Sequence, residues 1–312
     1  MQELDTNPPD NTAIDPFETW EGPTPQPAPR RIGSFRIVDP IAAGAMGQVF
    51  RALNEATGET VALKLIQRAD GREITERDRT LFLREMSVQS RLNHPRIVSI
   101  VDFGSANGEL FMAMEYVRTI DLFRELRNCD LRQQIRVVCG VGCYILAGLS
   151  YAHQKNIVHR DIKPSNILVY RNQLHKIGIK IADFGISKDM RSAGLSGMTS
   201  DGEMRGTPAF MSPEHLANSR DAGPASDVYS TAAVLYYFLS GCVPHQEDVG
   251  SSLRLAQIIE GGPIPLSSRR ASLPTALCDV IDRALLPLSA GRFETAIEFN
   301  QALLDFTRKK KV

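Results

Sequence analysis

Apolar and polar positions change their spacing along the chain, and the change predicts where the elements lie. Residues 35–66 alternate short β-rich runs with glycine-containing turns, and Ala56–Thr60 between two such runs predicts a hairpin. Residues 76–93 carry apolar side chains at helical spacing. The pair His94–Pro95 should end this helix, because a residue before proline avoids α geometry. The first third of the chain therefore predicts a sheet with one helix.

Helical patterns dominate after two more predicted strands, at 97–104 and 109–117. The predicted helices cover residues 131–153, 225–240, 252–261, 276–285 and 293–306. Between the first two of these helices, residues 166–170 and 175–185 predict short strands joined by an extended turn.

This order of elements predicts an α+β protein with two lobes. The smaller lobe is β-rich and covers about 32–117, and the larger lobe is helical and covers about 118–307. Ligands favour the crevice between such lobes, so we expect a binding site there.

Composition is that of a globular protein, with 43% hydrophobic and 23% charged residues among 312. The formal net charge is zero, so no overall field favours nucleic acid or an anionic membrane. The charge is unevenly spread, however. Residues 1–30 hold six acids, one base and seven prolines, so we predict a disordered acidic tail over 1–31. Its Trp20 is the only tryptophan, and a short basic end covers 308–312.

No segment predicts export or membrane insertion. The N-terminus has no basic and apolar signal pattern, and the uncharged run 137–152 is shorter than the about 20 residues that a span needs. That run therefore predicts a buried helix. The five cysteines lack C-x-x-C spacing, and we expect Cys139 and Cys143 to be buried thiols. A cytoplasmic protein is expected.

The segment 157–169 carries the first candidate chemistry. It places Asp161, Lys163 and Asn166 in a polar loop between apolar runs. A carboxylate there can accept a proton from a nucleophile, and an asparagine oxygen is a suitable ligand for Mg²⁺. Taken singly, each of these residues is more typical of a turn than of a catalytic site.

Together with other motifs, this loop resembles the Ser/Thr protein kinases of the bacterial, eukaryotic-like branch. The loop motif is "HRDIKPSN". The other motifs follow in family order: "VALK" (61–64), "FLREM" (82–86), "MEYV" (114–117), "ADFG" (182–185), "GTPAFMSPE" (206–214), "SDVYS" (226–230) and "AGRF" (290–293). The resemblance covers about 32–307 and implies the two-lobed protein kinase fold, with protein substrates bearing Ser or Thr acceptors, the chain itself in trans among them.

The resemblance also implies the catalytic roles. Lys64 would hold the α- and β-phosphates of ATP, and Glu85 would fix Lys64 by an ion pair. Asp161 would take the hydroxyl proton, and Lys163 would neutralise the γ-phosphate. Asp183 would bind Mg²⁺.

Further residues receive binding, regulatory and structural roles from the same resemblance. Asn166 would be the second metal ligand. The nucleotide contacts would be Ile41, Ala42, Ala43, Gly44, Ala45, Met46, Gly47, Val49, Ala62, Met114, Glu115 and Val117. Regulation would involve Arg160, Lys188 and the acceptor Thr199, beside Ser196 and Ser200. The structural residues would be Asp227 and the pair Glu214 and Arg292, which we expect to form a buried ion pair in the larger lobe.

Two positions depart from the family pattern. Ala42 stands where the phosphate-binding loop has its first glycine, and it costs little only if its backbone is extended. Gln89 replaces an apolar side chain that packs toward Phe184 and His159 in the family. These departures are the only features that favour a nucleotide-binding pseudokinase scaffold. A dinucleotide-binding oxidoreductase is rejected, because the strand 61–66 follows the glycine loop where that fingerprint needs a helix.

Overall fold

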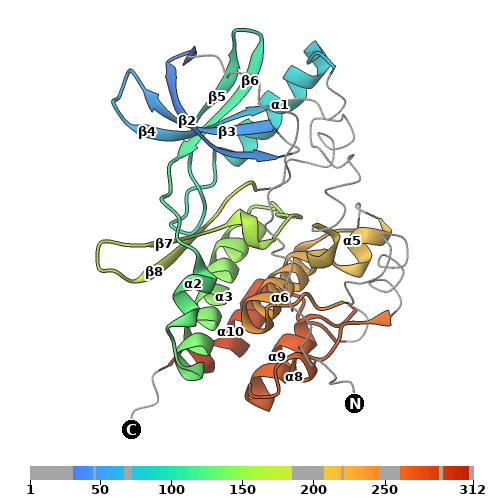
Figure 1. Ribbon diagram of the computed structural model, residues 1–312. Coiled ribbons are helices and arrows are strands. Elements are labelled where there is room, and N and C mark those ends of the chain that lie inside the picture. The colour runs from blue at the N-terminus through green and yellow to red at the C-terminus, as the bar shows by residue number, and fades with distance from the viewer. Residues whose placement is uncertain are drawn as a thin grey trace, which may run out of the picture.

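The computed structural model describes residues 31–44, 47–66, 72–184, 207–218, 221–245, 261–287 and 291–308. They form a smaller lobe built around a sheet and a larger lobe built of helices (Figure 1). The predicted α+β architecture of two lobes is therefore confirmed.

The smaller lobe is a six-stranded antiparallel sheet with one long helix. Its elements are β1 (Arg31–Ile32), β2 (Phe35–Gly44), β3 (Gly47–Asn54), β4 (Thr60–Ile66), α1 (Glu76–Gln89), β5 (Ile100–Ala106) and β6 (Glu109–Glu115). The strand order is β1-β2-β3-β4-β6-β5, and the predicted hairpin joins β3 to β4.

The two faces of this sheet bury different clusters, because side chains alternate along each strand. On β4, Leu63 and Leu65 pack on one face with Phe35 and Phe111. Ile66 lies on the other face, against Phe82 of α1. The intervening Lys64 shares the α1 face, and this alternation carries a charged side chain into the lobe.

Helix α1 begins at a capping box, in which Thr75 and Asp78 satisfy each other's backbone N–H groups. It ends at Gln89, four residues before the predicted end. The following segment bends onto the larger lobe, where the Asn93 backbone N–H donates to the Tyr151 hydroxyl over 3.2 Å. His94 stacks on the same Tyr151 ring. These tertiary contacts compete with the last helical turn, which explains the early end.

The larger lobe surrounds two central helices. Its elements are α2 (Leu122–Arg127), α3 (Leu131–Gln154), the 3₁₀ turn η1 (Pro164–Asn166), β7 (Ile167–Arg171), β8 (Ile177–Ile181), the 3₁₀ turn η3 (Thr207–Phe210), α5 (Pro213–Ala217), α6 (Pro224–Ser240), α8 (Leu266–Arg269), α9 (Thr275–Ala284) and α10 (Ala296–Thr307). Helix α6 is buried along nearly its whole length, and α3 packs between α6, α10 and β8.

Helix α3 is long and apolar enough to span a membrane by length and composition alone. In the structure its apolar side chains lie in the core of the larger lobe, as predicted for residues 137–152. Glycines allow the close packing: a Cβ on Gly142 would lie 2.7 Å from Leu235, and one on Gly148 would lie 2.9 Å from Ile181. Cys139 and Cys143 are free thiols in this helix, and burial raises the pKa of each, to about 12 and about 11.

Three predicted helices, 131–153, 225–240 and 276–285, agree with the structure to within one residue at each end. The last helix starts at Ala296 rather than 293, because Thr295 caps it by accepting from the Glu298 backbone N–H. The predicted helix 252–261 lies, except for its last residue, outside the described residues. Three short helices, α2, α5 and α8, have no counterpart among the predicted elements.

Candidate active site

Lys64 and Asp183 meet where the two lobes face each other. The Lys64 ammonium lies 2.9 Å from Asp183 Oδ1, and its side chain is only 4% exposed. Burial alone would raise the pKa of Asp183. The charge and the hydrogen bond of Lys64, together with the charge of Lys163, outweigh it and hold that pKa below its ordinary value. The carboxylate therefore stays ionised beside a buried cation.

Glu85 does not make the predicted ion pair with Lys64. Within the described part of the chain Glu85 has no ion pair, and Lys64 bonds Asp183 instead. Helix α1 turns Phe82, Met86 and Gln89 toward the interior, while Glu85 lies half-buried at the edge of that face. The difference therefore has a physical reason, which is the rotation of α1 relative to β4.

The catalytic-loop residues converge on the Asp161 carboxylate, which is 7% exposed. Lys163 Nζ lies 3.2 Å from Asp161 Oδ2. The Asn166 amide nitrogen donates to the Asp161 backbone carbonyl over 2.7 Å and to Oδ2 over 3.1 Å. This orientation leaves the Asn166 side-chain oxygen as the group that can serve as a ligand.

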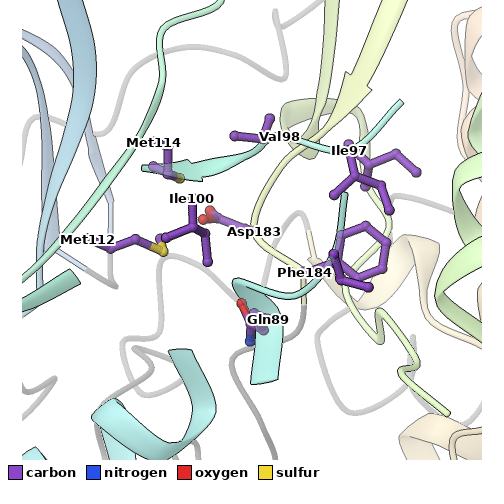
Figure 2. A pocket seen from close by; sticks show the side chains of 10 residues that line it. Gln89, Ile97, Val98, Ile100, Met112, Met114, Asp183 and Phe184 are labelled. Carbon is purple, nitrogen blue, oxygen red and sulfur yellow. The ribbon is translucent and has the colours of Figure 1, made fainter. Parts of the chain in front are cut away.

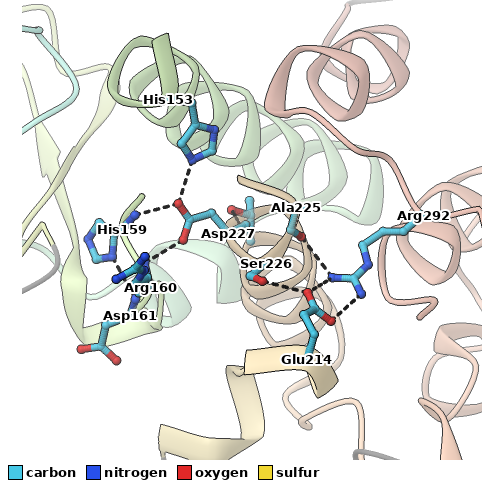
Figure 3. Close-up of polar contacts among 10 residues, drawn as sticks. His153, His159, Arg160, Asp161, Glu214, Ala225, Ser226, Asp227 and Arg292 are labelled. Atoms are coloured by element: carbon cyan, nitrogen blue, oxygen red, sulfur yellow. Dashed lines mark hydrogen bonds and ion pairs between the residues drawn. The ribbon is translucent and has the colours of Figure 1, made fainter. Parts of the chain in front are cut away.

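Asp227, in the first turn of α6, anchors this loop (Figure 3). Its carboxylate accepts from the backbone N–H groups of His159 and Arg160 over 2.8 Å each, and lies 2.8 Å from His153 Nε2. Burial would raise the pKa of Asp227, but these partners lower it. The hydrogen bond from the Arg160 backbone N–H to Asp227 also holds Arg160 in a left-handed conformation, with φ of 65°. Such a conformation is strained for a residue with a side chain and needs this support.

His159 connects the loop to the segment after β8. Its ring packs edge-on against Phe184, with centroids 4.7 Å apart. The Nε2 atom lies 3.0 Å from the Ala182 carbonyl, and Nδ1 accepts from the Asp161 backbone N–H. Burial lowers the pKa of His159, so the ring is neutral, and both contacts then fit one tautomer with the proton on Nε2.

The predicted ion pair of the larger lobe is present. Arg292 binds Glu214 through two nitrogen–oxygen contacts of 2.8 Å each (Figure 3). Its third nitrogen, Nε, donates to the Leu286 carbonyl. Ser226 donates to the same carboxylate. Although burial opposes it, this set of donors lowers the pKa of Glu214 to about 2.

A small cavity of about 20 Å³ lies behind Asp183 and Phe184, large enough for about one water molecule. Figure 2 shows Gln89, at the end of α1, among its lining side chains. The other lining residues are apolar, and Met114 at the end of β6 is among them. Gln89, which replaces an apolar side chain of the family pattern, therefore lies beside Phe184, where the resemblance implied an apolar contact.

The segment between the lobes contains an interaction that sequence reasoning missed. Glu115 Oε1 accepts from the Ser99 backbone N–H over 2.8 Å and from Lys180 Nζ over 2.6 Å. The Glu115 carboxylate therefore has partners within the protein, and its backbone N–H also donates to the Ser99 carbonyl over 3.0 Å. No signal in the local sequence links Lys180 to Glu115, which lies 65 residues away.

The structure describes the glycine loop, residues 41–49, on both sides of its tip at residues 45 and 46. Ala42 lies within β2, opposite Val49 of β3, and Gly44 pairs with Gly47. Ala42 is extended, and it is not among the described residues with positive φ. The alanine therefore fits its backbone conformation. Ala45, Met46, Lys188 and Thr199 lie outside the described residues.

Comparison with known proteins agrees with this geometry. Residues 35–305 match the family model of the protein kinase domain. The chain belongs to the protein kinase family. The serine/threonine-protein kinase pkn3 of Myxococcus xanthus is 34% identical over 89% of this chain. The chain spans only half of that relative, and 44% of PknJ of Mycobacterium tuberculosis, which is 34% identical.

Solved kinase structures share the fold. The kinase domain of Mycobacterium tuberculosis PknI is 25% identical, with a TM-score of 0.65 over 88% of this chain and 97% of that one. Rad53 1-466 in complex with AMP-PNP is 26% identical, with a TM-score of 0.67 over 88% of this chain and 66% of that one. The family and fold implied by the sequence motifs are therefore confirmed.

Proposed function

We propose that this kinase domain transfers the γ-phosphoryl group of ATP to Ser or Thr hydroxyls of proteins. One observation carries the proposal: the buried Asp161 carboxylate has Lys163 and Asn166 bonded to it. A carboxylate, a cation and an amide oxygen gathered at one point suit the orientation of a hydroxyl and the stabilisation of a phosphate. The curated relatives, named as serine/threonine-protein kinases, support the same activity.

Each side chain would act through its charge. Asp161 accepts the proton of the attacking hydroxyl as the new P–O bond forms, and the bond to the leaving diphosphate breaks. Lys163, already 3.2 Å from that carboxylate, neutralises charge on the transferred group. Protein phosphorylation by this chain, including phosphorylation of a second copy, follows from the same chemistry.

The donor atoms fit a nucleotide-bound Mg²⁺. Mg²⁺ is usually held by one or two carboxylates together with substrate phosphates, and Asp183 and the Asn166 oxygen supply hard oxygen ligands of that kind. When bound, the ion neutralises charge on the phosphates of ATP. The neighbour solved with AMP-PNP supports a nucleotide in this crevice.

Nucleotide binding requires a change of partner at Lys64. In the structure its ammonium neutralises Asp183, so that carboxylate is not yet available to a metal ion. We expect α1 to rotate so that Glu85 reaches Lys64 and releases Asp183. The half-buried place of Glu85, at the edge of the inward face of α1, supports a movement of this kind.

Phosphorylation in the segment 183–214 is the proposed trigger. Arg160 is held by Asp227 next to Asp161, and its Nε atom is buried without a hydrogen-bond partner. A phosphate on Thr199 would add about −1.5 to −2 charge that this guanidinium and Lys188 could bind. Replacing Thr199 by Ala should then lower activity toward an added substrate.

The proposed activity is tested by incubating the protein with labelled ATP and Mg²⁺ and a Ser/Thr-rich protein substrate. Label on Ser or Thr that disappears in the Asp161→Asn variant supports the proposal. Absence of label in the parent, with nucleotide still bound in a thermal-shift assay, would point to a nucleotide-binding scaffold. Mapping of phosphorylated residues in the same sample shows whether Thr199 is modified.

A further inference from the structure

The outer face of α1 carries an unusual row of arginines. Arg77, Arg84 and Arg91 are all exposed and lie seven residues apart, the last in the turn that continues the helix. Seven residues are nearly two helical turns, so these side chains follow one face with a spacing of about 10 Å. Among the described residues none of the three has an ion pair, in contrast to Arg79, which pairs with Glu76.

Exposed apolar side chains flank this row. Leu83 is 40% exposed and Val88 is 43% exposed, one on each side of the arginines. The sheet covers the opposite face of α1, through Phe82 and Met86. The outer face of α1 therefore offers positive charge together with apolar surface, which suits a peptide that is both acidic and aromatic.

The chain contains one such peptide, in its own N-terminal segment. Asp15, Glu18 and Glu21 are spaced by three residues, with Phe17 and Trp20 between them. In the polyproline II form that the prolines favour, three residues make one turn and span about 9 Å, so the three acids share one face. The acids would thus repeat at the spacing of the arginines.

The point where this segment joins the smaller lobe is close to α1. Asn107 donates to the Arg31 carbonyl over 3.0 Å, and Arg79 of α1 donates to the carbonyl of the neighbouring Gly108 over 3.1 Å. Nine residues separate Glu21 from Arg31. They reach about 30 Å when extended, enough to bring Glu21 to the first turns of α1.

We propose that residues 15–21 of the same chain dock on the outer face of α1. Glu21 pairs with Arg77, Glu18 with Arg84 and Asp15 with Arg91, while Phe17 and Trp20 pack on apolar surface beside this row. This contact does not depend on phosphoryl transfer. It would tie the N-terminal segment to the helix that carries Glu85.

Trp20 makes the docking directly measurable, because it is the only tryptophan in the chain. Acrylamide quenching of its fluorescence should be weaker in the full chain than in a synthetic peptide of residues 1–30. Raising the salt to about 1 M shortens the Debye length to about 3 Å and should raise quenching toward the value of the peptide. Equal quenching of chain and peptide in dilute buffer overturns the proposal.

Charge reversal identifies the surface. The variant R77E/R84E/R91E should show the quenching of the free peptide. The control R124E/R127E/R132E changes three exposed arginines around α2 and should match the parent. An equal effect of the two variants contradicts docking on α1. Because all six positions are exposed, thermal unfolding should show that each variant is folded.

The pairing scheme is tested by exchange of charges. Arg84→Glu alone should expose Trp20 in part, and adding Glu18→Arg should restore its shielding. Failure of this restoration contradicts the proposed register. The shielding should also be independent of protein concentration, since a dependence on concentration would show that the segment of a second copy binds instead.

Discussion

The two lobes differ in how far their side chains are already arranged for the proposed reaction. In the larger lobe, Asp161 is held by Lys163 and Asn166, and its loop is bonded to Asp227. In the smaller lobe, Lys64 bonds Asp183, and Glu85 has no ion pair among the described residues. The group proposed to accept the proton is therefore preorganised, whereas the groups proposed to bind phosphate would have to exchange partners first.

This difference follows from the packing of each lobe. The loop around Asp161 lies on α6, which is buried along nearly its whole length and cannot shift without disrupting the core. Helix α1 contacts its sheet through one face only and exposes the other. A helix with one buried face can rotate at lower cost, so the smaller lobe is where regulation can act.

The largest expected effect comes from the preorganised half. Asp161→Asn keeps the shape of the side chain but removes the proton acceptor, so phosphoryl transfer should fall by about 10²–10⁴-fold. Nucleotide affinity should change little, because Asp161 is not a predicted phosphate ligand. Turnover and nucleotide affinity of the variant check both points. Transfer at the rate of the parent would remove Asp161 from the mechanism.

The Arg292–Glu214 pair tests how rigid the larger lobe must be. Arg292→Ala leaves a partly buried carboxylate without its partner and should lower the free energy of unfolding by about 3–5 kcal/mol. Urea unfolding of parent and variant gives this difference. A loss near zero would show that the lobe does not depend on this pair.

The same pair predicts a pH dependence of stability. The folded pKa of Glu214 is about 2, below the ordinary value of 4.5. Its contribution is therefore complete above about pH 4.5 and is lost as the pH falls toward 2. The stability difference between the parent and Glu214→Gln should shrink as the pH is lowered through this window. A difference that stays constant would contradict the lowered pKa.

Glu85 tests the exchange of partners in the smaller lobe. Glu85→Gln should lower kcat/KM, because it raises the activation free energy by about 1.5–3 kcal/mol. This is the range for a charge-assisted hydrogen bond that forms only in the active alignment. Its free energy of unfolding should stay within about 0.5 kcal/mol of the parent, because Glu85 makes no ion pair in the structure. Lys64→Met should lower activity and also disturb the resting pair with Asp183. Equal activity of Glu85→Gln and parent would contradict the proposed rotation of α1.

The substitution Ala42→Gly should have the smallest effect on activity. Ala42 lies extended within β2, so this position does not need the conformational freedom of glycine. A glycine here would weaken the strand by about 0.5–1 kcal/mol. Ala42→Gly should therefore raise the KM for ATP by no more than about fivefold. Steady-state kinetics of parent and variant measure it. A large gain of activity in Ala42→Gly would show instead that the loop of the parent is impaired.

Much of the site could be predicted because its residues lie in short contiguous motifs. The loop with Asp161, Lys163 and Asn166 spans six residues, and its geometry depends mainly on local backbone contacts. The alternation along β4 places Lys64 on the face opposite Leu63 and Leu65, but only the tertiary structure shows that α1 covers this face. The ion pair of Glu214 with Arg292 came only from the family resemblance.

Other features were decided only by tertiary structure. Whether Lys64 bonds Glu85 or Asp183 depends on the rotation of one helix relative to a loop of the other lobe, and no local pattern records that angle. The bond of Lys180 to Glu115 and the early end of α1 at Gln89 arise in the same way, from contacts between distant segments. The sequence by itself determined the longer elements, though not all of their ends, and the set of chemical groups, because these follow from local periodicity and residue type. The packing of the lobes decided which oppositely charged groups meet, because Coulomb energies at contact distance depend on ångström-scale placement that only the assembled core sets.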